Sequence, residues 1–311
     1  MEMAGFSGTV VKSTGSAHWV RRPEGNTIMC RLKGTFRMKG IRTTNPVAVG
    51  DHVEGELQDD GTGLITRIQP RKNYIIRKAI NLSRESHILA ANLDQAILMV
   101  TLKAPVTLSM FVDRFLVTAE AYSIPVRLVF NKIDLYSEDQ MMIMAEWVEA
   151  YNLADYACLP LSLATGRGME AVRDLLHGKV TLLAGNSGVG KTTLINRLNP
   201  GLKLKTADIS DYHQSGKHTT TFPEMIEVLS GGFLIDTPGI RGFGVIEIGK
   251  EELYHYFPEL FKWSKGCQFH NCSHTHEPEC AVRKAVEEGL IGEMRYRNYL
   301  AMMESGEEKY R

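Results

Sequence analysis

The pattern of hydrophobic and polar positions changes twice along the chain, and its first part alternates with the short period of β-strands. Such strands are predicted at residues 8–11, 27–32, 51–57 and 64–68. Asp60-Gly61 is a favoured hairpin turn between the last two. Several short strands with little helical periodicity are typical of a small barrel. The pattern therefore predicts a five-stranded OB-type β-barrel, but it does not by itself separate this fold from an SH3-like barrel.

The second part opens with a continuous apolar run, Gln95–Val100, which indicates a strand covered on both faces. Helix and strand patterns then alternate. Helices are predicted near 109–122, 138–152 and 168–177, and strands near 126–130, 156–161, 180–184 and 232–235. This alternation predicts a mostly parallel α/β sheet, in which ligands bind at the carboxyl ends of the strands.

From about residue 245 the pattern becomes mostly helical. Helices are predicted at 281–288 and 292–305, next to a cluster of Cys and His residues. We therefore divide the chain into three domains. Residues 1–78 form the barrel, residues 79–246 form the α/β domain, and residues 247–311 form the helical domain.

Charge is unevenly distributed, although 36 Lys and Arg balance 36 Asp and Glu. Residues 1–80 contain thirteen basic and seven acidic side chains, and the segment 27–50 contains no acid. The basic residues of that segment are Arg31, Lys33, Arg37, Lys39 and Arg42. A basic face on a neutral protein favours a polyanionic partner for the barrel, such as nucleic acid. The alternative is that these cations only protect a strand edge from aggregation.

No apolar run approaches the roughly 20 residues that a membrane-spanning helix needs. The first residues contain neither a basic stretch nor an apolar signal core. We therefore expect a cytoplasmic protein without membrane association. Because the chain lacks coiled-coil heptads, we also expect a monomer.

A phosphate-binding loop follows the predicted strand 180–184. Its residues are Gly185, Asn186, Ser187, Gly188, Val189, Gly190, Lys191 and Thr192, with Thr193 beside them. The glycines let backbone N–H groups converge on phosphates. Lys191 is expected to contact the β- and γ-phosphates, and the Thr192 hydroxyl is expected to bind Mg²⁺.

The sequence Asn131-Lys132-Ile133-Asp134, at the end of the predicted strand 126–130, selects the base. The Asp134 carboxylate can accept hydrogen bonds from the N1–H and N2–H₂ groups of guanine, which adenine does not offer. Asn131 can reach the O6 and N7 side, and the Lys132 stem can lie over the base plane. The motif therefore predicts that the nucleotide is GTP or GDP rather than ATP.

Ser162 and Leu163 lie where a second base-contacting loop is expected, acting through the Ser162 side chain and the Leu163 backbone. A plain strand-to-helix turn would have the same pattern. The order of the motifs is unusual, because the guanine motif precedes the phosphate loop by about fifty residues. In ordinary Ras-like GTPases it follows that loop. All the parts are present, so the sequence predicts a P-loop GTPase whose strands are connected in circularly permuted order.

Two segments have the form of nucleotide-dependent switches. Asp236-Thr237-Pro238-Gly239 follows an apolar strand; Asp236 is expected to hold Mg²⁺ through a water, and the Gly239 N–H is expected to face the γ-phosphate. Thr219, or its neighbour Thr220, is expected to close on Mg²⁺ only when the γ-phosphate is present.

Ile240 stands where Ras-like enzymes carry the glutamine that orients the attacking water. An aliphatic side chain cannot orient water, so slow intrinsic hydrolysis is expected. Our hypothesis is that His218 helps in its place. The alternatives are a residue supplied by a partner and an inert, solvated His218. The candidate catalytic residues are His218, Thr219, Asp236 and Gly239.

The C-terminal cluster has the spacing Cys267-x₄-Cys272-x-His274-x₅-Cys280. Three thiolates and one imidazole form a closed tetrahedral set that suits one structural Zn²⁺ ion. In a small helical domain such an ion would add stability that the core does not supply. His270 and His276 are rival ligands that the sequence does not exclude.

This combination resembles the RsgA family, the bacterial GTPases that depend on the small ribosomal subunit. The barrel, the permuted motif order, the segment His218–Thr221 and the cluster Cys267–Cys280 all agree with it, and the resemblance covers essentially the whole chain. Two departures are small. Leu163 replaces a more usual alanine but would act through its backbone, and Thr192 replaces a common serine but keeps the hydroxyl.

The resemblance implies a late assembly factor that binds the small (30S) ribosomal subunit and its 16S rRNA near the decoding region. It further implies subunit-stimulated hydrolysis of GTP to GDP, and zinc ligands at the four cluster positions. A nucleotide-gated RNA-binding scaffold with little hydrolysis is the alternative. Ile240 is compatible with that scaffold, whereas Lys191, Thr192 and Asp236 favour hydrolysis.

Overall fold

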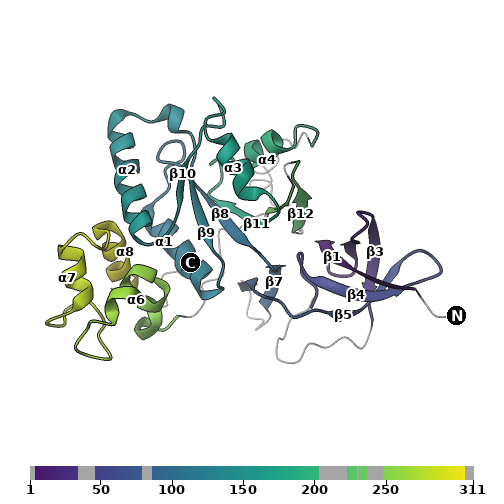
Figure 1. The fold of residues 1–311 in the computed structure, drawn as a ribbon, viewed down its shortest axis with the longest axis horizontal. Coiled ribbons are helices and arrows are strands. Elements are labelled where there is room, and N and C mark those ends of the chain that lie inside the picture. The colour runs from purple at the N-terminus through teal and green to yellow at the C-terminus, as the bar shows by residue number, and fades with distance from the viewer. Residues whose placement is uncertain are drawn as a thin grey trace, which may run out of the picture. The chain divides into compact units, whose positions relative to one another are not determined.

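The structure, a computed structural model, describes residues 4–33, 46–78, 86–202, 223–229, 231–236 and 248–304 (Figure 1). The chain forms two compact units, which we describe in turn. The first unit comprises Met1–Gln95, Arg173–Ala184 and Leu198–Gly244, and the second comprises Ala96–Val172, Gly185–Arg197 and Val245–Arg311. The division into three domains at residues 78 and 246 stays a prediction.

A closed five-stranded barrel opens the first unit (Figure 1). Its strands are β1 (Gly5–Ser13), β2 (His18–Arg21), β3 (Thr27–Leu32), β4 (His52–Leu57) and β5 (Gly63–Ile68). Strand β1 pairs with both β2 and β4, and β3 pairs with β5 in parallel, so the order β1-β2-β3-β5-β4 closes on itself. This order confirms the OB-type barrel. The sequence pattern missed β2, which has only four residues.

The barrel interior is built from alternate positions of its strands, because successive side chains of a strand point to opposite faces. Each strand contributes one hydrophobic side chain that is 0 % exposed. These residues are Val10, Val20, Cys30, Val53 and Ile65. The predicted turn at Asp60-Gly61 joins β4 to β5; Gly61 has a φ of +79°, and the Thr62 N–H donates to the Asp60 carboxylate at 2.9 Å.

A buried ion pair fixes the chain where it leaves the barrel. The Arg71 guanidinium donates through Nε and Nη2 to the two carboxylate oxygens of Asp51, each at 2.6 Å, and Asp51 is 0 % exposed. The following strands, β6 (Tyr74–Lys78) and β7 (Ser86–Ala91), form a separate antiparallel pair. The sequence analysis did not predict these two strands.

Three further strands complete the first unit: β11 (Val180–Gly185), β12 (Glu224–Glu227) and β13 (Phe233–Asp236). Strands β11 and β13 are parallel, and β12 is antiparallel to β13. Strand β12 also pairs with β1 of the barrel, with Lys12 opposite Glu224. The predicted strands at 180–184 and 232–235 are therefore present, and β12 was missed.

The second unit contains a parallel sheet in the order β10-β9-β8, formed by β8 (Gln95–Val100), β9 (Val126–Phe130) and β10 (Cys158–Pro160). All six residues of β8 are buried, as the continuous apolar run predicted. The helices of this part are α1 (Ser109–Ala121), the 3₁₀ turn η1 (Ile133–Leu135) and α2 (Glu138–Leu153). The boundary between the units cuts through α3 (Met169–Leu176) and α4 (Lys191–Leu198).

Local sequence explains where α2 begins and what it covers. Ser137 and Gln140 form a reciprocal capping box, in which each side chain accepts a hydrogen bond from the other residue's backbone N–H, at 3.3 and 3.0 Å. Trp147 packs edge-on against Phe130 of β9, with ring centroids 6.3 Å apart. The helix therefore lies against the sheet through its aromatic face.

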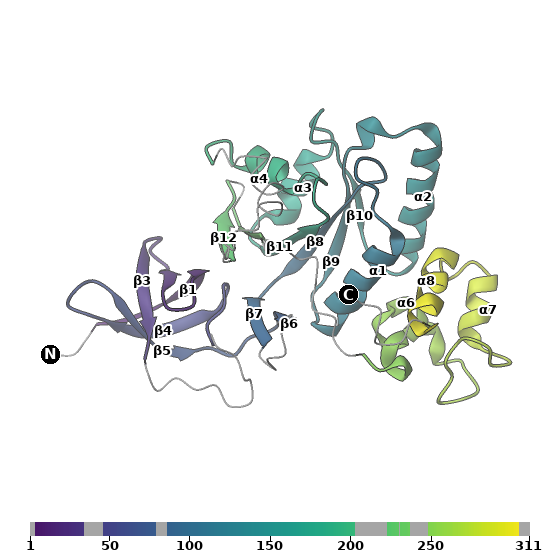
Figure 2. The same cartoon turned by 180° about the vertical axis from the view of Figure 1, so that it is seen from behind.

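The chain ends in a lobe of short helices, visible from both sides in Figures 1 and 2. They are η3 (Lys250–Tyr256), α6 (Pro258–Ser264), α7 (Ala281–Glu287) and α8 (Glu293–Glu304). Phe257, Leu260 and Tyr299 are fully buried in the lobe, and Val117 of α1 belongs to the same hydrophobic core. None of the described helices is long and apolar enough to cross a membrane.

A fully buried arginine holds this lobe against α1. Arg295 of α8 donates through Nε and Nη2 to Glu259 of α6, at 2.6 and 2.9 Å, and through Nη1 to Asp113 of α1, at 2.6 Å. Asn298 donates to the second oxygen of Asp113 at 2.5 Å. The Phe257 ring lies 4.9 Å from the guanidinium carbon. The three charges are thus paired and hydrogen-bonded, as buried charges must be.

Replacing Arg295 by Met should lower the free energy of unfolding by about 3–5 kcal/mol, because it leaves the buried carboxylates of Asp113 and Glu259 without a cation. Urea unfolding at neutral pH measures this loss. Arg297→Met is the matched control in the same helix, because its side chain is 68 % exposed and pairs only at the surface with Glu293. Equal losses in the two variants would contradict a special role for the buried network.

Candidate nucleotide and metal sites

Three parallel strands end at the same level and bring the predicted base-binding loops together. Val100 of β8 is in register with Phe130 of β9, and Phe130 is in register with Pro160 of β10. Asn131 follows β9 directly, and Ser162 lies two residues beyond β10. The two loops predicted to contact guanine therefore lie at the carboxyl edge of one sheet, where α/β folds bind ligands.

The Asn131 side chain joins three loops. It is 1 % exposed; its Nδ2 donates to the Val189 carbonyl of the phosphate loop at 2.7 Å, and its Oδ1 accepts from the Leu163 N–H at 3.2 Å. Tyr136, which the sequence analysis missed, donates to the Asn131 carbonyl at 2.8 Å and accepts from the Leu102 N–H at 2.9 Å. Asn131 therefore connects the loops that follow β8, β9, β10 and β11, and its predicted contact with the base stays a prediction.

Asp134 and Lys132 are held by neighbouring groups. Ser162 donates to Asp134 Oδ1 at 2.5 Å, and the same hydroxyl accepts from the Thr165 N–H at 3.1 Å. Lys132 has a φ of +64°, and its Nζ donates to the Ala104 carbonyl. Asp134 is exposed, which leaves its carboxylate accessible to a ligand. The role of these side chains in guanine binding stays a prediction.

The phosphate loop needs its glycines for conformation and for space. Gly185, Gly188 and Gly190 have φ values of +137°, +80° and +108°, which L side chains rarely adopt. A Cβ at Gly190 would lie 2.5 Å from Asn131 Nδ2. A side chain there would therefore separate the phosphate loop from the guanine motif. The close approach of Asn131 is therefore a second reason for glycine at position 190. This reason depends on the tertiary structure and is not contained in the motif.

The loop leads directly into α4, whose N-terminal N–H groups face the loop as an anion site requires. Lys191 Nζ donates to the carbonyls of Gly185 and Asn186, at 2.7 and 2.9 Å, so the ammonium lies over the loop. Thr192 is buried and Thr193 is exposed. Their assignment to phosphate and Mg²⁺ binding stays a prediction.

The predicted switch residues are only partly described. The backbone of Asp236 ends β13, in register with Leu183 of β11, two residues before the phosphate loop starts. His218, Thr219, Thr220, Gly239 and Ile240 lie outside the described residues, as do Arg37, Lys39 and Arg42 of the basic segment.

The C-terminal cluster is assembled as the spacing predicted. The ligand atoms of Cys267, Cys272, His274 and Cys280 all lie within 4.8 Å of one another. His274 Nδ1 is 3.5 Å from both Cys267 Sγ and Cys280 Sγ, and Cys272 Sγ is 3.7 Å from Cys280 Sγ. One four-coordinate metal ion could be held between atoms at this spacing. His270 and His276 are exposed and do not belong to the cluster.

Hydrogen bonds around the cluster fix the loop that carries it. Glu277 accepts from the Ser273 N–H and hydroxyl, each at 2.6 Å. Burial opposes ionisation of Glu277, but these bonds outweigh it and lower its pKa to about 2. Tyr296 and Tyr299 of α8 donate to the carbonyls of His274 and Ser273, each at 2.7 Å. The cluster is thus tied to the helix that carries Arg295.

Burial raises the pKa of the Cys272 thiol to about 12. Without a cation this thiol therefore stays protonated at neutral pH, and metal binding would have to displace the proton. A bound cation would compensate the charge of the buried thiolates. The chemistry of the donor set therefore agrees with its geometry.

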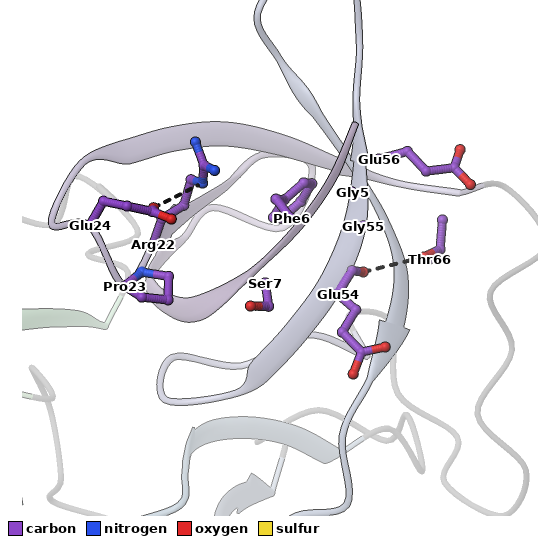
Figure 3. Close-up of a pocket in the computed structure, with 10 residues that line it drawn as sticks. All are labelled: Gly5, Phe6, Ser7, Arg22, Pro23, Glu24, Glu54, Gly55, Glu56 and Thr66. Atoms are coloured by element: carbon purple, nitrogen blue, oxygen red, sulfur yellow. Dashed lines mark hydrogen bonds and ion pairs between the residues drawn. The ribbon is translucent and has the colours of Figure 1, made fainter. Parts of the chain in front are cut away.

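A pocket of about 500 Å³ lies on the barrel surface (Figure 3). Glu54 and Glu56 line it together with Arg22, which is paired with Glu24 at 3.4 Å. Its walls thus carry more carboxylates than cations, so it is unsuited to the phosphates of a nucleotide.

The RsgA GTPase family model matches residues 68–246, and the model of the RsgA N-terminal domain matches residues 7–65. The small ribosomal subunit biogenesis GTPase RsgA of Bacteroides fragilis is 54 % identical over 307 residues, which cover 98 % of this chain and 99 % of the relative. The chain belongs to the RsgA family. It is a GTP-hydrolysing enzyme, and a GTPase of this kind uses Mg²⁺ with its nucleotide.

A second relative and two solved structures are similar to this chain in sequence and in fold. The Porphyromonas gingivalis protein is 53 % identical over 312 residues, covering 98 % of this chain and 99 % of its own. The crystal structure of YjeQ from Thermotoga maritima matches with a TM-score of 0.79 at 37 % identity, covering 96 % of this chain and 98 % of that one. YloQ, described as a circularly permuted GTPase, matches with a TM-score of 0.76 at 29 % identity, covering 96 % and 94 %. The predicted permuted fold is confirmed.

Replacing Asn131 by Ala should weaken GDP binding by about 10- to 100-fold, because two hydrogen bonds that join the loops are lost and the buried Leu163 N–H is left unpaired. Titration with a fluorescent GDP analogue measures the affinity. Asn152→Ala, at an exposed position of α2, is the control and should bind as the parent does. Unchanged affinity in Asn131→Ala would exclude the bridging role.

If the cluster holds a metal ion, replacing Cys272 by Ser should remove most of that metal and lower the thermal stability of the lobe, because the ion would link the loop to α7. Elemental analysis after dialysis measures the metal content. Cys158→Ser, in β10 and outside the cluster, should keep the metal, as should His276→Ala. Full metal content in Cys272→Ser would contradict the ligand assignment.

Proposed function

We propose that this chain is a late assembly factor of the small ribosomal subunit, which hydrolyses GTP when the subunit stimulates it. The observation that carries the proposal is the 54 % identity, over 98 % of the chain, to a protein named small ribosomal subunit biogenesis GTPase. The loops around Asn131 support it, because the motifs that a GTPase needs meet at one sheet edge.

In this proposal the nucleotide is recognised at its two ends. The Asp134 carboxylate accepts hydrogen bonds from guanine, while Asn131 and Lys132 border the base. Backbone N–H groups of Gly185–Thr193 and the Lys191 ammonium neutralise the phosphates. The Thr192 and Thr219 hydroxyls would hold Mg²⁺, which supplies charge neutralisation between the β- and γ-phosphates when bound.

Hydrolysis depends on the switch residues. The backbone of Asp236 ends β13 in register with Leu183 of β11, and β11 runs directly into the phosphate loop. Gly239 would present its N–H to the γ-phosphate, and Thr219 would close only on the triphosphate. With Ile240 in place of a water-orienting glutamine, His218 is the group that we propose to orient the water, with the ribosomal subunit as activator.

The metal at the C-terminal cluster would be a structural Zn²⁺ ion. Zinc–sulfur bonds of about 2.3 Å at tetrahedral angles would place the three sulfurs about 3.8 Å apart, with the His274 imidazole as the fourth ligand. The sulfur–sulfur separations of Cys272 and Cys267 from Cys280 are 3.7 and 3.9 Å. The set is closed, with no position left for a substrate.

The barrel would contact 16S rRNA. Its cationic outer residues and its OB-type topology favour a single-stranded or structured RNA. We further propose a cytoplasmic monomer with domain boundaries near residues 78 and 246. A nucleotide-gated scaffold with little hydrolysis is not favoured, because the family is one of GTPases.

Purified small ribosomal subunits should accelerate GTP hydrolysis at least about tenfold at fixed salt, as activators do for other GTPases that lack a complete catalytic set. Phosphate release with and without subunits measures the effect. Large subunits at the same concentration are the control. GTP binding without any acceleration would point to the scaffold instead.

Replacing His218 by Ala should lower the subunit-stimulated rate about 10- to 100-fold, with little effect on GTP affinity, because general acid–base and water-orienting groups act mainly in the transition state. Single-turnover hydrolysis and nucleotide titration separate the two quantities. His270→Ala, an exposed histidine of the C-terminal lobe, is the control. An unchanged rate in His218→Ala would mean that a group of the ribosomal subunit, rather than His218, orients the attacking water.

A further inference from the structure

Two cations of the barrel are already paired with carboxylates of strand β12. Lys12 Nζ lies 3.1 Å from Glu224 Oε2. The Arg21 guanidinium meets Glu227 with both terminal nitrogens, of which Nη2 is 2.9 Å from Oε1. The Arg21 guanidinium carbon also lies 5.3 Å from the centre of the Phe233 ring in β13. All these residues belong to the first compact unit.

The same two cations lie on the barrel surface that OB-type folds use for nucleic acid. Val20 and Cys30 are fully buried, so their strand neighbours Trp19, Arg21 and Met29 face outward. Trp19 is opposite Met29 in the β2–β3 pair, and Lys12 Nζ lies 5.7 Å from the centre of the Trp19 ring. Cations beside an aromatic side chain on this face are typical of RNA binding.

RNA phosphates can replace the carboxylates of β12 as partners of the two cations. The side chains of Lys12 and Arg21 are 39 % and 32 % exposed, and those of Glu224 and Glu227 are 54 % and 53 % exposed. Exposed ion pairs contribute little to stability. A phosphate offers the guanidinium fork the same two-oxygen geometry as a carboxylate. An RNA backbone supplies many such groups and gains further from counterion release.

We propose that RNA phosphates and strand β12 compete for Lys12 and Arg21. In the free protein Glu224 and Glu227 occupy the two cations, and RNA binding to the barrel displaces them. The inference rests on the proposed function, because it takes rRNA as the ligand of the barrel. It adds to that function the cations that bind the RNA, Lys12 and Arg21, and the acidic strand β12 that pairs with them in the free protein.

The competition would connect RNA binding to the switch segments. Strand β12 begins at Glu224, five residues after Thr219, and Glu224 is in register with Asp236, where β13 runs into the second switch segment. The Lys12–Glu224 contact therefore lies at the end of the β12–β13 pair from which both switch segments continue in sequence. Release of Glu224 by RNA changes the charge at that end.

The test combines two double variants in a cycle, with small-subunit binding measured at fixed salt and in the same nucleotide. Glu224→Gln with Glu227→Gln frees the cations and should tighten binding about three- to tenfold, as expected for the loss of two competing surface pairs. Glu146→Gln with Glu149→Gln, at exposed positions of α2, makes the same change in net charge and should have a smaller effect.

Lys12→Gln with Arg21→Gln should weaken binding and also abolish the gain from the glutamate variants, because coupled residues are not additive. An equal gain with and without the two cations, or an equal gain in the α2 control, would overturn the competition. Binding of the parent protein tests the proposed function separately. If the parent protein does not bind subunits, the same double-variant cycle is measured with an oligouridylate as the ligand. Absence of binding to that RNA as well would overturn the inference.

Discussion

Asn131 uses both ends of its side-chain amide, donating to the Val189 carbonyl and accepting from the Leu163 N–H. Through these bonds the phosphate loop, the guanine motif and the Ser162 loop form one surface. The contact is tertiary, because Asn131 and Val189 are 58 residues apart in the chain and the sheet edge brings their loops together. Gly190 completes the arrangement by leaving the amide room to approach.

A second constraint is the buried charge of Arg295. Moving a guanidinium and two carboxylates out of water is costly, and it is tolerated here because Asp113 and Glu259 pair with the cation and Asn298 satisfies a remaining oxygen. Asp113 belongs to α1 and Arg295 to the C-terminal lobe. The lobe is therefore held to α1 by a network in which each of these donors has a defined acceptor. The same helix α8 also holds the loop of the Cys–His cluster through two tyrosines, so this loop and α1 are hydrogen-bonded to one helix.

Buried and exposed ion pairs of this chain suit different tasks. Arg295 and its partners are inaccessible to water and ions, so that network is permanent in the folded protein. Lys12, Arg21 and their glutamates are partly exposed, so salt and competing phosphates can reach them. A protein that must keep its lobe attached while its barrel exchanges partners would place its charges in this manner. The buried pairs specify structure, and the exposed pairs remain exchangeable.

The sequence by itself determined the local features. The apolar run of β8, the OB-type strand pattern, the phosphate loop and the Cys–His spacing each depend on neighbouring residues, and each was found. Strands β2 and β12 were missed because each sets only two apolar residues between polar or charged ones, whereas the equally short β13 carries a continuous apolar run. Only the tertiary structure decided that His274 rather than His270 or His276 joins the cluster, that Gly190 faces Asn131, and that Arg295 meets Asp113. The physical reason is the same in each case: a motif records backbone conformation and chemical type, whereas the partner of a side chain depends on which distant segments the packed core brings within a few ångströms.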